Sequence, residues 1–397
     1  MASTSSALPP PTKGWDTRES LADMPVDRAI KLINWFPESD KITVRRGSTE
    51  HVTGMTGAVE TLVTYTPTTG SGQLFAAANN AIYNVSATGA VGSAVSTGHS
   101  NNRWQFTNMG TSGGQFVRLF NGADTPLLYN GSSWATTAIT GSGLTAANLI
   151  WGNLHQRRLW VGEEDSLSAY YLGVNSVSGA ATEFPLAGIA TKGGFIMAMG
   201  TWTRDSGSGA DDVAVFLTSE GEAIVYSGTD PAAAATWQLV GVFAIGKPIG
   251  RRCIVKAGSD IILMTQDGFV PLSGILSMDR SQSRLVALSD QIAQAVNTAV
   301  RSYGDIFGWQ PILYPKSTML IFNIMQSSTT SHQYVFNTIS GAPCQFTGMN
   351  AICFGMLDDD MYFGTSDGKV VKFDDGTSDS GAVIEADALQ AFSYFKS

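Results

Sequence analysis

The chain has little charge, few cysteines and no long apolar run. Only 14% of its 397 residues are Asp, Glu, Lys or Arg, whereas 43 are glycine. Low charge with abundant glycine is typical of an all-β protein with many turns, and of a subunit that hides much of its surface in an assembly. The formal charge of −9 argues against broad coating of nucleic acid, but it leaves room for a local basic patch.

Three cysteines, Cys253, Cys344 and Cys353, are too few and too scattered for a disulfide framework, which favours synthesis in a reducing compartment. Residues 1–14 are rich in Ser, Thr and Pro and lack the apolar stretch of a signal peptide. No window reaches the ~18 apolar residues of a membrane helix. These absences predict a soluble protein made in a cytoplasm.

Motifs of common enzyme classes are also missing. The four histidines, at positions 51, 99, 155 and 332, show no metal-ligand spacing, and neither a GxSxG elbow nor a P-loop occurs. The loop of residues 205–212 concentrates carboxylates that could hold Ca²⁺, but it lacks the spacing and terminal Glu of a calcium loop. We therefore expect a protein that is not an enzyme and has no cofactor or metal.

What the chain does contain is a hairpin pattern that recurs three times. Residues 218–222, 265–269 and 365–369 each place an acidic residue before glycine, between two apolar runs. Glycine accepts the positive φ of such a turn. The first and second copies start 47 residues apart. The second and third start 100 residues apart, which leaves room for one more unit between them. A strand-built period of about 40–50 residues predicts a β-propeller.

Four further strand pairs share this layout. They span residues 74–85, 116–129, 158–172 and 319–336. We therefore predict an all-β fold with a single β-propeller of about seven blades, the alternative being six blades and an extra hairpin. Closure into a ring lets each small sheet cover its neighbour. We expect the strand at residues 42–46, or the one at residues 60–65, to complete the last blade.

Two segments depart from the strand pattern. Residues 1–26 are expected to form a flexible N-terminal arm, and residues 27–397 the propeller domain. A single helix is predicted near residues 285–300, between the fifth and sixth units, because apolar residues recur there at helical spacing and Ser289 and Asp290 can cap it. It serves either as a packing or docking element or as a seal between blades.

The tryptophans are spread along the chain, which favours a role in the core between blades. A carbohydrate site that uses some of them as stacking platforms is the alternative. These residues include Trp35, Trp104, Trp134, Trp151, Trp160, Trp202, Trp237 and Trp309.

The lead-in Leu-Ile-Asn-Trp-Phe-Pro-Glu at residues 32–38, with Val-Arg-Arg-Gly-Ser at residues 44–48, resembles the opening of bacteriophage head-to-tail propeller proteins. A longer run is similar to a family of phage virion structural proteins. That run comprises residues 155–160, 165–166, 200–205, 221–226, 228–231 and 246–252. The resemblance covers roughly residues 27–395 and implies a tail component of a short-tailed phage, nearest to the tail nozzle or packaged-DNA stabilisation protein.

The resemblance further implies a homo-oligomeric ring, a hexamer by analogy, below the adaptor and portal. The ring would surround the DNA exit channel and help to retain and then release the genome. Its partners would be further copies of itself, the phage adaptor or portal, tail fibre or needle proteins, and genomic DNA that passes without sequence-specific binding. Its location would be the virion tail, after synthesis in the host cytoplasm. A receptor- or glycan-binding propeller of the phage tail is the alternative.

A conduit for DNA should not grip phosphates, because each contact would slow ejection. We therefore expect acidic loops to line the lumen of the ring, the alternative being that they are ordinary solvated turns. The candidate residues are Glu163, Glu164, Asp165, Asp211, Asp212, Asp358, Asp359 and Asp360.

Overall fold

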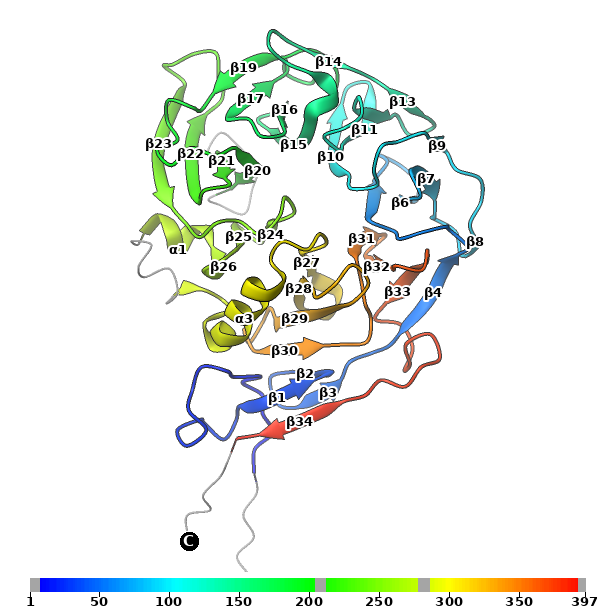
Figure 1. The fold of residues 1–397 in the computed structure, drawn as a ribbon, viewed down its shortest axis with the longest axis vertical. Coiled ribbons are helices and arrows are strands. Elements are labelled where there is room, and N and C mark those ends of the chain that lie inside the picture. Colours follow the sequence, from blue (N-terminus) through cyan, green and yellow to red (C-terminus); the bar gives the residue numbers. More distant parts are fainter. Residues whose placement is uncertain (1–7, 204–211, 278–285, 392–397) are drawn as a thin grey trace, which may run out of the picture.

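Seven small antiparallel sheets stand around a central opening like the blades of a wheel (Figure 1). The computed structural model describes residues 8–203, 212–277 and 286–391. The chain runs around the ring in order, and the first strand of each blade lies innermost. The predicted seven-bladed propeller is therefore confirmed.

Blades one to four each contain four strands in sequence order. Blade one has β5 (Thr61–Tyr65), β6 (Gln73–Ala78), β7 (Ala81–Asn84) and β9 (Ser96–Thr97). Blade two has β10 (Gln105–Thr111), β11 (Gly114–Phe120), β12 (Leu127–Tyr129) and β13 (Trp134–Thr136). Blade three has β15 (Leu149–His155), β16 (Arg158–Glu163), β17 (Ser168–Tyr171) and β19 (Thr182–Pro185). Blade four has β20 (Ile196–Trp202), β21 (Val213–Thr218), β22 (Glu222–Gly228) and β23 (Trp237–Ala244).

Blades five to seven are less regular. Blade five has three strands, β24 (Ile254–Ala257), β25 (Asp260–Thr265) and β26 (Gly268–Pro271), and continues into helix α1 (Leu272–Ser277). Blade six begins with β27 (Gln310–Tyr314), β28 (Met319–Met325), β29 (Ser331–Asn337) and β30 (Pro343–Phe346). Blade seven takes β31 (Cys353–Leu357), β32 (Asp360–Gly364) and β33 (Val370–Phe373) from the end of the chain and β4 (Ser48–Thr53) from its beginning.

Short elements connect the blades. The strand β8 (Gly89–Ala90) runs parallel to β4, and β14 (Ile139–Thr140) pairs with β18 (Gly179–Ala180). The 3-10 turns η1 (Ala146–Asn148) and η4 (Pro315–Ser317) precede β15 and β28. Within the described residues, no helix has the length and apolar character needed to span a membrane.

Each of the seven predicted hairpins joins the second and third strands of one blade. The turn chemistry explains why the sequence revealed them. Gly221, Gly268 and Gly368 adopt φ values of +82°, +125° and +77°, which a residue with a side chain rarely accepts. A methyl group on Gly368 would lie only 1.9 Å from the carbonyl oxygen of Met55, so this turn also requires the close approach of two backbones.

The closing strand differs from the prediction. Neither residues 42–46 nor residues 60–65 complete the last blade, because β4 pairs antiparallel with β33 and joins Val52 to Val370 and Ser48 to Phe373. Instead, β3 (Ile42–Val44) pairs with β2 (Trp35–Pro37), and β5 is the inner strand of blade one. The sequence Ser-Thr-Glu-His-Val-Thr of β4 carries little apolar signal, since an outer strand needs only one partly buried face.

The helix predicted between the fifth and sixth units is present. It consists of the turn η3 (Asp290–Ile292) and helix α3 (Ala293–Tyr303), which buries Val296 and Ala299. Ser289 stands at the N-cap of η3, but its side chain makes no cap hydrogen bond; its Oγ accepts one from the backbone N–H of Phe269, at 3.0 Å. The predicted cap thus joins α3 to blade five. The short helix α1 was not predicted.

A further pair of strands extends blade six outward. The strand β1 (Ala29–Ile33) runs parallel to β30, the outermost strand of blade six. The strand β34 (Asp387–Gln390) runs antiparallel to β1 and forms the outer edge of this six-stranded sheet. Together with the hairpin β2–β3, these strands form what we call the outer layer, at the bottom of Figure 1. The segment before β1 packs on the same blade: the backbone N–H of Trp15 donates to the carbonyl of Pro343 at 2.7 Å.

Blade two contains a buried charge for which the described part of the chain offers no counter-ion. The side chain of Arg118 in β11 is fully buried, and burial lowers its pKa to about 10. Its Nη2 donates to the carbonyl oxygen of Thr137 at 2.8 Å, whereas its Nε and Nη1 find no partner among the described residues. Buried polar atoms without partners destabilise a fold.

We expect Arg118→Met to raise the free energy of unfolding by about 1–3 kcal/mol, because methionine keeps much of the packed stem and removes the desolvated charge. Urea denaturation of both proteins measures the difference. Arg157→Met is the control, because Arg157 is exposed and its replacement should change little. A less stable Arg118→Met variant would contradict this prediction.

Candidate functional site

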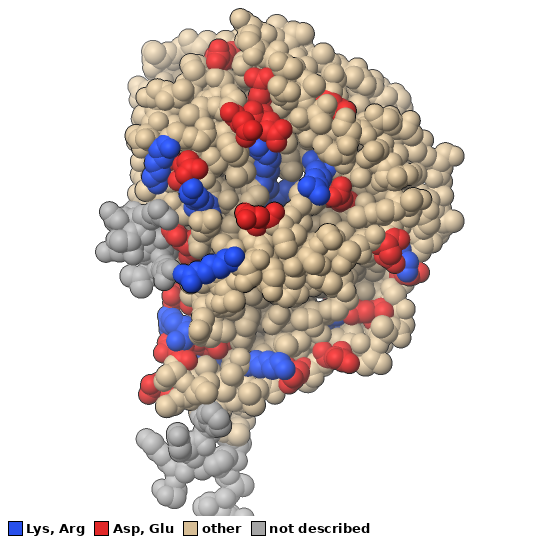
Figure 2. Space-filling model, in the orientation of Figure 1, with Lys and Arg blue, Asp and Glu red and all other residues tan. Residues whose placement is uncertain are grey.

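A cavity of about 950 Å³ lies at the centre of the ring of blades, and charged side chains surround the opening (Figure 2). We call it the axial cavity. A second cavity of about 480 Å³, lined mainly by inner strands, shares Gln105, Arg251 and Arg252 with it. The two cavities therefore follow the propeller axis and meet at these three side chains.

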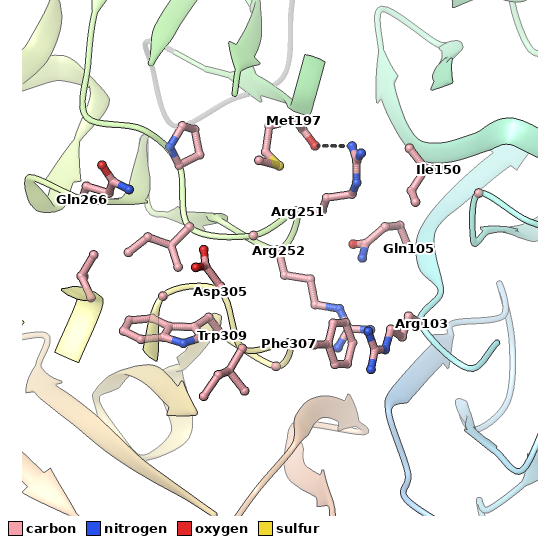
Figure 3. A pocket seen from close by; sticks show the side chains of 18 of the residues that line it. Arg103, Gln105, Ile150, Met197, Arg251, Arg252, Gln266, Asp305, Phe307 and Trp309 are labelled. Carbon is pink, nitrogen blue, oxygen red and sulfur yellow. Dashed lines mark hydrogen bonds between the residues drawn. The ribbon is translucent and has the colours of Figure 1, made fainter. Parts of the chain in front are cut away.

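Loops from several blades supply the arginines of the axial cavity. Arg251 and Arg252 lie in the connection between β23 and β24, and Arg103 lies just before β10. Phe307 comes from the segment between α3 and β27, and Arg301 from α3 itself. The loops lead into β10, β24 and β27, the innermost strands of blades two, five and six. The fold therefore brings Arg103, Arg252 and Phe307 close to the axis of the propeller (Figure 3).

Neutral acceptors hold the two adjacent arginines. Arg252 donates to Thr61 Oγ1 at 2.7 Å and to the carbonyl oxygens of Glu60 and Trp104, both at 3.1 Å. Arg251 donates through Nη1 to the carbonyl oxygens of Ile196 and Met197, at 3.3 and 3.4 Å (Figure 3). These bonds tie the loop of blade five to blades one, two and four across the opening.

The electrostatic environment of these arginines is unusual. Burial lowers the pKa of Arg251, although the nearby carboxylates of Glu164 and Asp165 oppose the shift. Burial also lowers the pKa of Arg252, and the positive charge of Arg103 adds to this shift. Among the described residues, only Arg103 of these three makes an ion pair, at 3.0 Å from its Nε to Glu60 Oε1.

The aromatic ring of Phe307 contacts two of the arginines. The guanidinium carbons of Arg103 and Arg252 lie 4.4 and 5.0 Å from the centroid of its ring. Such contacts attract a cation to the face of an aromatic ring. The ring therefore helps to hold two like charges near each other.

This arrangement suits recognition of anions rather than proton transfer, because arginine stays charged at physiological pH. In the described part of the chain, no three His, Cys, Asp or Glu side chains come together in a way that could hold a metal ion. All three cysteines are buried; burial raises the pKa of Cys253 and Cys353 to about 12 and also raises that of Cys344 well above its usual value. None of them is a thiolate at neutral pH.

The predicted acidic residues lie on two different faces of the ring. Glu163 ends the second strand of blade three, Glu164 and Asp165 lie in the turn that follows, and Glu164 lines the axial cavity. Asp212, Asp358 and Asp359 lie between first and second strands and Asp360 begins the second strand of blade seven, all at the opposite face, because consecutive strands are antiparallel. Asp211 lies outside the described residues. The structure therefore does not gather these carboxylates on one surface.

Several of the acidic side chains have local partners. Glu163 accepts from the backbone N–H of Thr145 at 2.8 Å, and Asp358 accepts from that of Gly72 at 3.0 Å. Burial tends to raise the pKa of Asp360, but hydrogen bonds from Lys316 and Lys372 lower it below its usual value. Their placement along a lumen of an assembled ring stays a prediction.

The tryptophans mostly serve the core. Trp104, Trp151, Trp160, Trp237 and Trp309 are buried, and Trp35, Trp134 and Trp202 are half-buried. Of the acidic loop at residues 205–212, only Asp212 lies within the described residues. Sequence patterns did not point to the axial arginines as a site; adjacent arginines at the start of an inner strand, in a chain with little charge, are the signal that could have found them.

Comparison with known proteins bears on the fold alone. No family model matches the chain, and no curated protein matches it. Among solved structures, the crystal structure of BBS1N in complex with ARL6DN is similar, with a TM-score of 0.53 and 10% identity over 86% of this chain and 100% of that one. A computationally designed protein, Ika8, is 10% identical over 82% of this chain and 99% of its own, with a TM-score of 0.46. The seven blades of the structure make this chain a β-propeller protein.

Proposed function

We propose that this chain is a structural subunit of a phage tail, which forms a homo-oligomeric nozzle ring around the DNA exit channel and helps to retain and release the genome. The observation that supports it is the outer layer. Its strands contain the lead-in residues that resemble phage head-to-tail proteins, and they stand outside the ring of blades.

Two residues of the resembling motif anchor the outer layer. Asn34 is buried at φ +58°, and its amide donates to the carbonyl of Glu385 at 2.7 Å and accepts from the backbone N–H of Thr347 at 2.9 Å. Arg45 is also buried; it donates to Asn34 Oδ1 at 2.9 Å and forms an ion pair with Asp379. These contacts join the beginning of the domain to blade six and to the C-terminal segment.

The outer layer and its surroundings leave large apolar side chains in water. Val44 and Ile339, 43% and 75% exposed, flank a groove of about 370 Å³. Val383 and Leu389, 85% and 54% exposed, lie on the C-terminal segment that contains the edge strand β34. An exposed apolar surface at a sheet edge is suited to contact with a second copy of the chain. A ring requires such a contact to repeat from copy to copy.

Ile339→Lys should convert the ring into monomers, because a charge would then be buried without a partner at the contact between copies. Light scattering coupled to size-exclusion chromatography measures the mass. Val95→Lys is the matched control: Val95 is an exposed apolar residue of blade one, and its variant should assemble like the wild type. A wild-type protein that stays monomeric at high concentration would contradict the proposed assembly.

The location in the virion needs a separate test. Negative-stain imaging of purified particles with a label on an N-terminal tag should place the label on the tail axis. Labels on peripheral fibres would instead favour the receptor-binding alternative and overturn the proposed nozzle.

A further inference from the structure

The axial cavity contains more positive charge than its own contacts neutralise. Four arginines line it, and in the described part of the chain Arg251, Arg252 and Arg301 form no ion pair. The ion pair of Arg103 with Glu60 uses its Nε, and neither terminal nitrogen of Arg103 donates to a residue that the structure describes. Desolvated guanidinium groups bind oxyanions strongly, because a charge-assisted hydrogen bond is about twice as strong as a neutral one.

Contacts within the protein hold the arginine side chains in place before any ligand binds. The bonds of Arg252 to Thr61 and to two carbonyl oxygens, and the contact of Arg103 and Arg252 with Phe307, hold like charges together. The side chain of Arg251 points the other way, toward Met197, where its Nη1 donates to the carbonyl oxygens of Ile196 and Met197 (Figure 3). Preorganised donors lose little conformational entropy when they bind a ligand.

Carboxylates elsewhere in the same cavity limit what can enter. Glu164, Asp267 and Asp305 also line it. An extended polyanion such as a nucleic acid would have to pass these negative charges, whereas a compact anion can contact the arginines and avoid them. The cavity therefore favours a small ligand.

We propose that the axial cavity is a binding site for a small oxyanion, a phosphate or a carboxylate, held by Arg103 and Arg252 beside the ring of Phe307. This site is separate from the outer layer, so it does not depend on the proposed ring. Its ligand would join loops of blades two and five at the axis and stabilise the propeller.

Isothermal titration calorimetry of the full chain with inorganic phosphate and with succinate, against chloride at matched ionic strength, tests the site and separates its two ligand sources. We expect saturable binding of one or both oxyanions and none of chloride. Arg103→Gln should weaken binding about tenfold or more, because it removes charge-assisted bonds from a half-exposed side chain that the fold tolerates losing. Arg251→Gln should weaken it by less, because Arg251 points away from Arg103 and Arg252 and acts on the ligand only at longer range.

Two further variants separate a site from a folding effect. Glu164→Gln removes a repulsive carboxylate from the cavity and should tighten binding about two- to fivefold. Arg46→Gln changes an exposed arginine away from the axis and should leave binding unchanged. Absence of saturable binding by both oxyanions, or equal affinities in wild type, Arg103→Gln and Glu164→Gln, would overturn the proposal.

Discussion

Lowering the pH from about 7 to about 4.5 should reduce the free energy of unfolding by several kcal/mol, because the fold holds its histidines neutral. His155 and His332 are almost completely buried, and burial lowers the pKa of each to about 4. One ring nitrogen of each, Nε2, is buried without a partner among the described residues, so neither has an acceptor that would favour a proton there. Burial also lowers the pKa of His51 and His99.

The direction of this pH effect follows from the protons that the folded and unfolded states bind. Above the usual histidine pKa of 6.5, both states are neutral and the full stability is present. As the pH falls from 6.5 toward 4, the unfolded state binds protons that the folded state excludes, so the stability falls. The difference is about 1.4 kcal/mol per pH unit for each histidine, or about 3 kcal/mol for each over the whole interval.

Denaturant unfolding at a series of pH values measures this slope. The variants His155→Gln and His332→Gln should each reduce the slope of the unfolding free energy against pH by the contribution of about one proton, since glutamine does not titrate. His99→Gln should flatten it less, because the nearby carboxylate of Asp124 opposes the effect of burial on the pKa of His99. An unchanged slope in the double variant of His155 and His332 would contradict the prediction.

Trp160→Ala should lower the free energy of unfolding by about 3–5 kcal/mol, because it removes a large, fully buried side chain at the contact between blades three and four. Trp160 is fully buried in β16. Its ring centroid lies 5.6 Å from those of Phe216 and Trp237, both of blade four, and it stacks on Trp237 with an angle of 18°.

Thermal or urea unfolding measures the loss. Phe106→Ala is the matched control, because Phe106 is a large aromatic residue on the inner strand β10 that is 36% exposed. Its replacement should cost about 1 kcal/mol or less. A Trp160→Ala variant no less stable than Phe106→Ala would show that contact between these blades contributes little to stability.

Local features let the sequence predict the blades. The turns at Gly221, Gly268 and Gly368 require positive φ, and the apolar runs beside them form the buried second and third strands. The helix near Val296 was equally clear, because its apolar residues recur at helical spacing. Each of these signals lies within a short stretch of chain, so no knowledge of distant contacts was needed.

The amino-acid sequence by itself indicated a β-propeller of about seven blades, and it determined the hairpin in each blade and the position of the helix; the choice between seven blades and six came from the structure. Only the tertiary structure decided that β4 closes the ring, that β1 meets β34 across the length of the chain, and that Arg103, Arg251 and Arg252 share one cavity. The reason is physical: a turn or a helical face is specified by neighbouring residues, whereas strand pairing at an edge and the meeting of loops at an axis depend on packing between segments far apart in the chain.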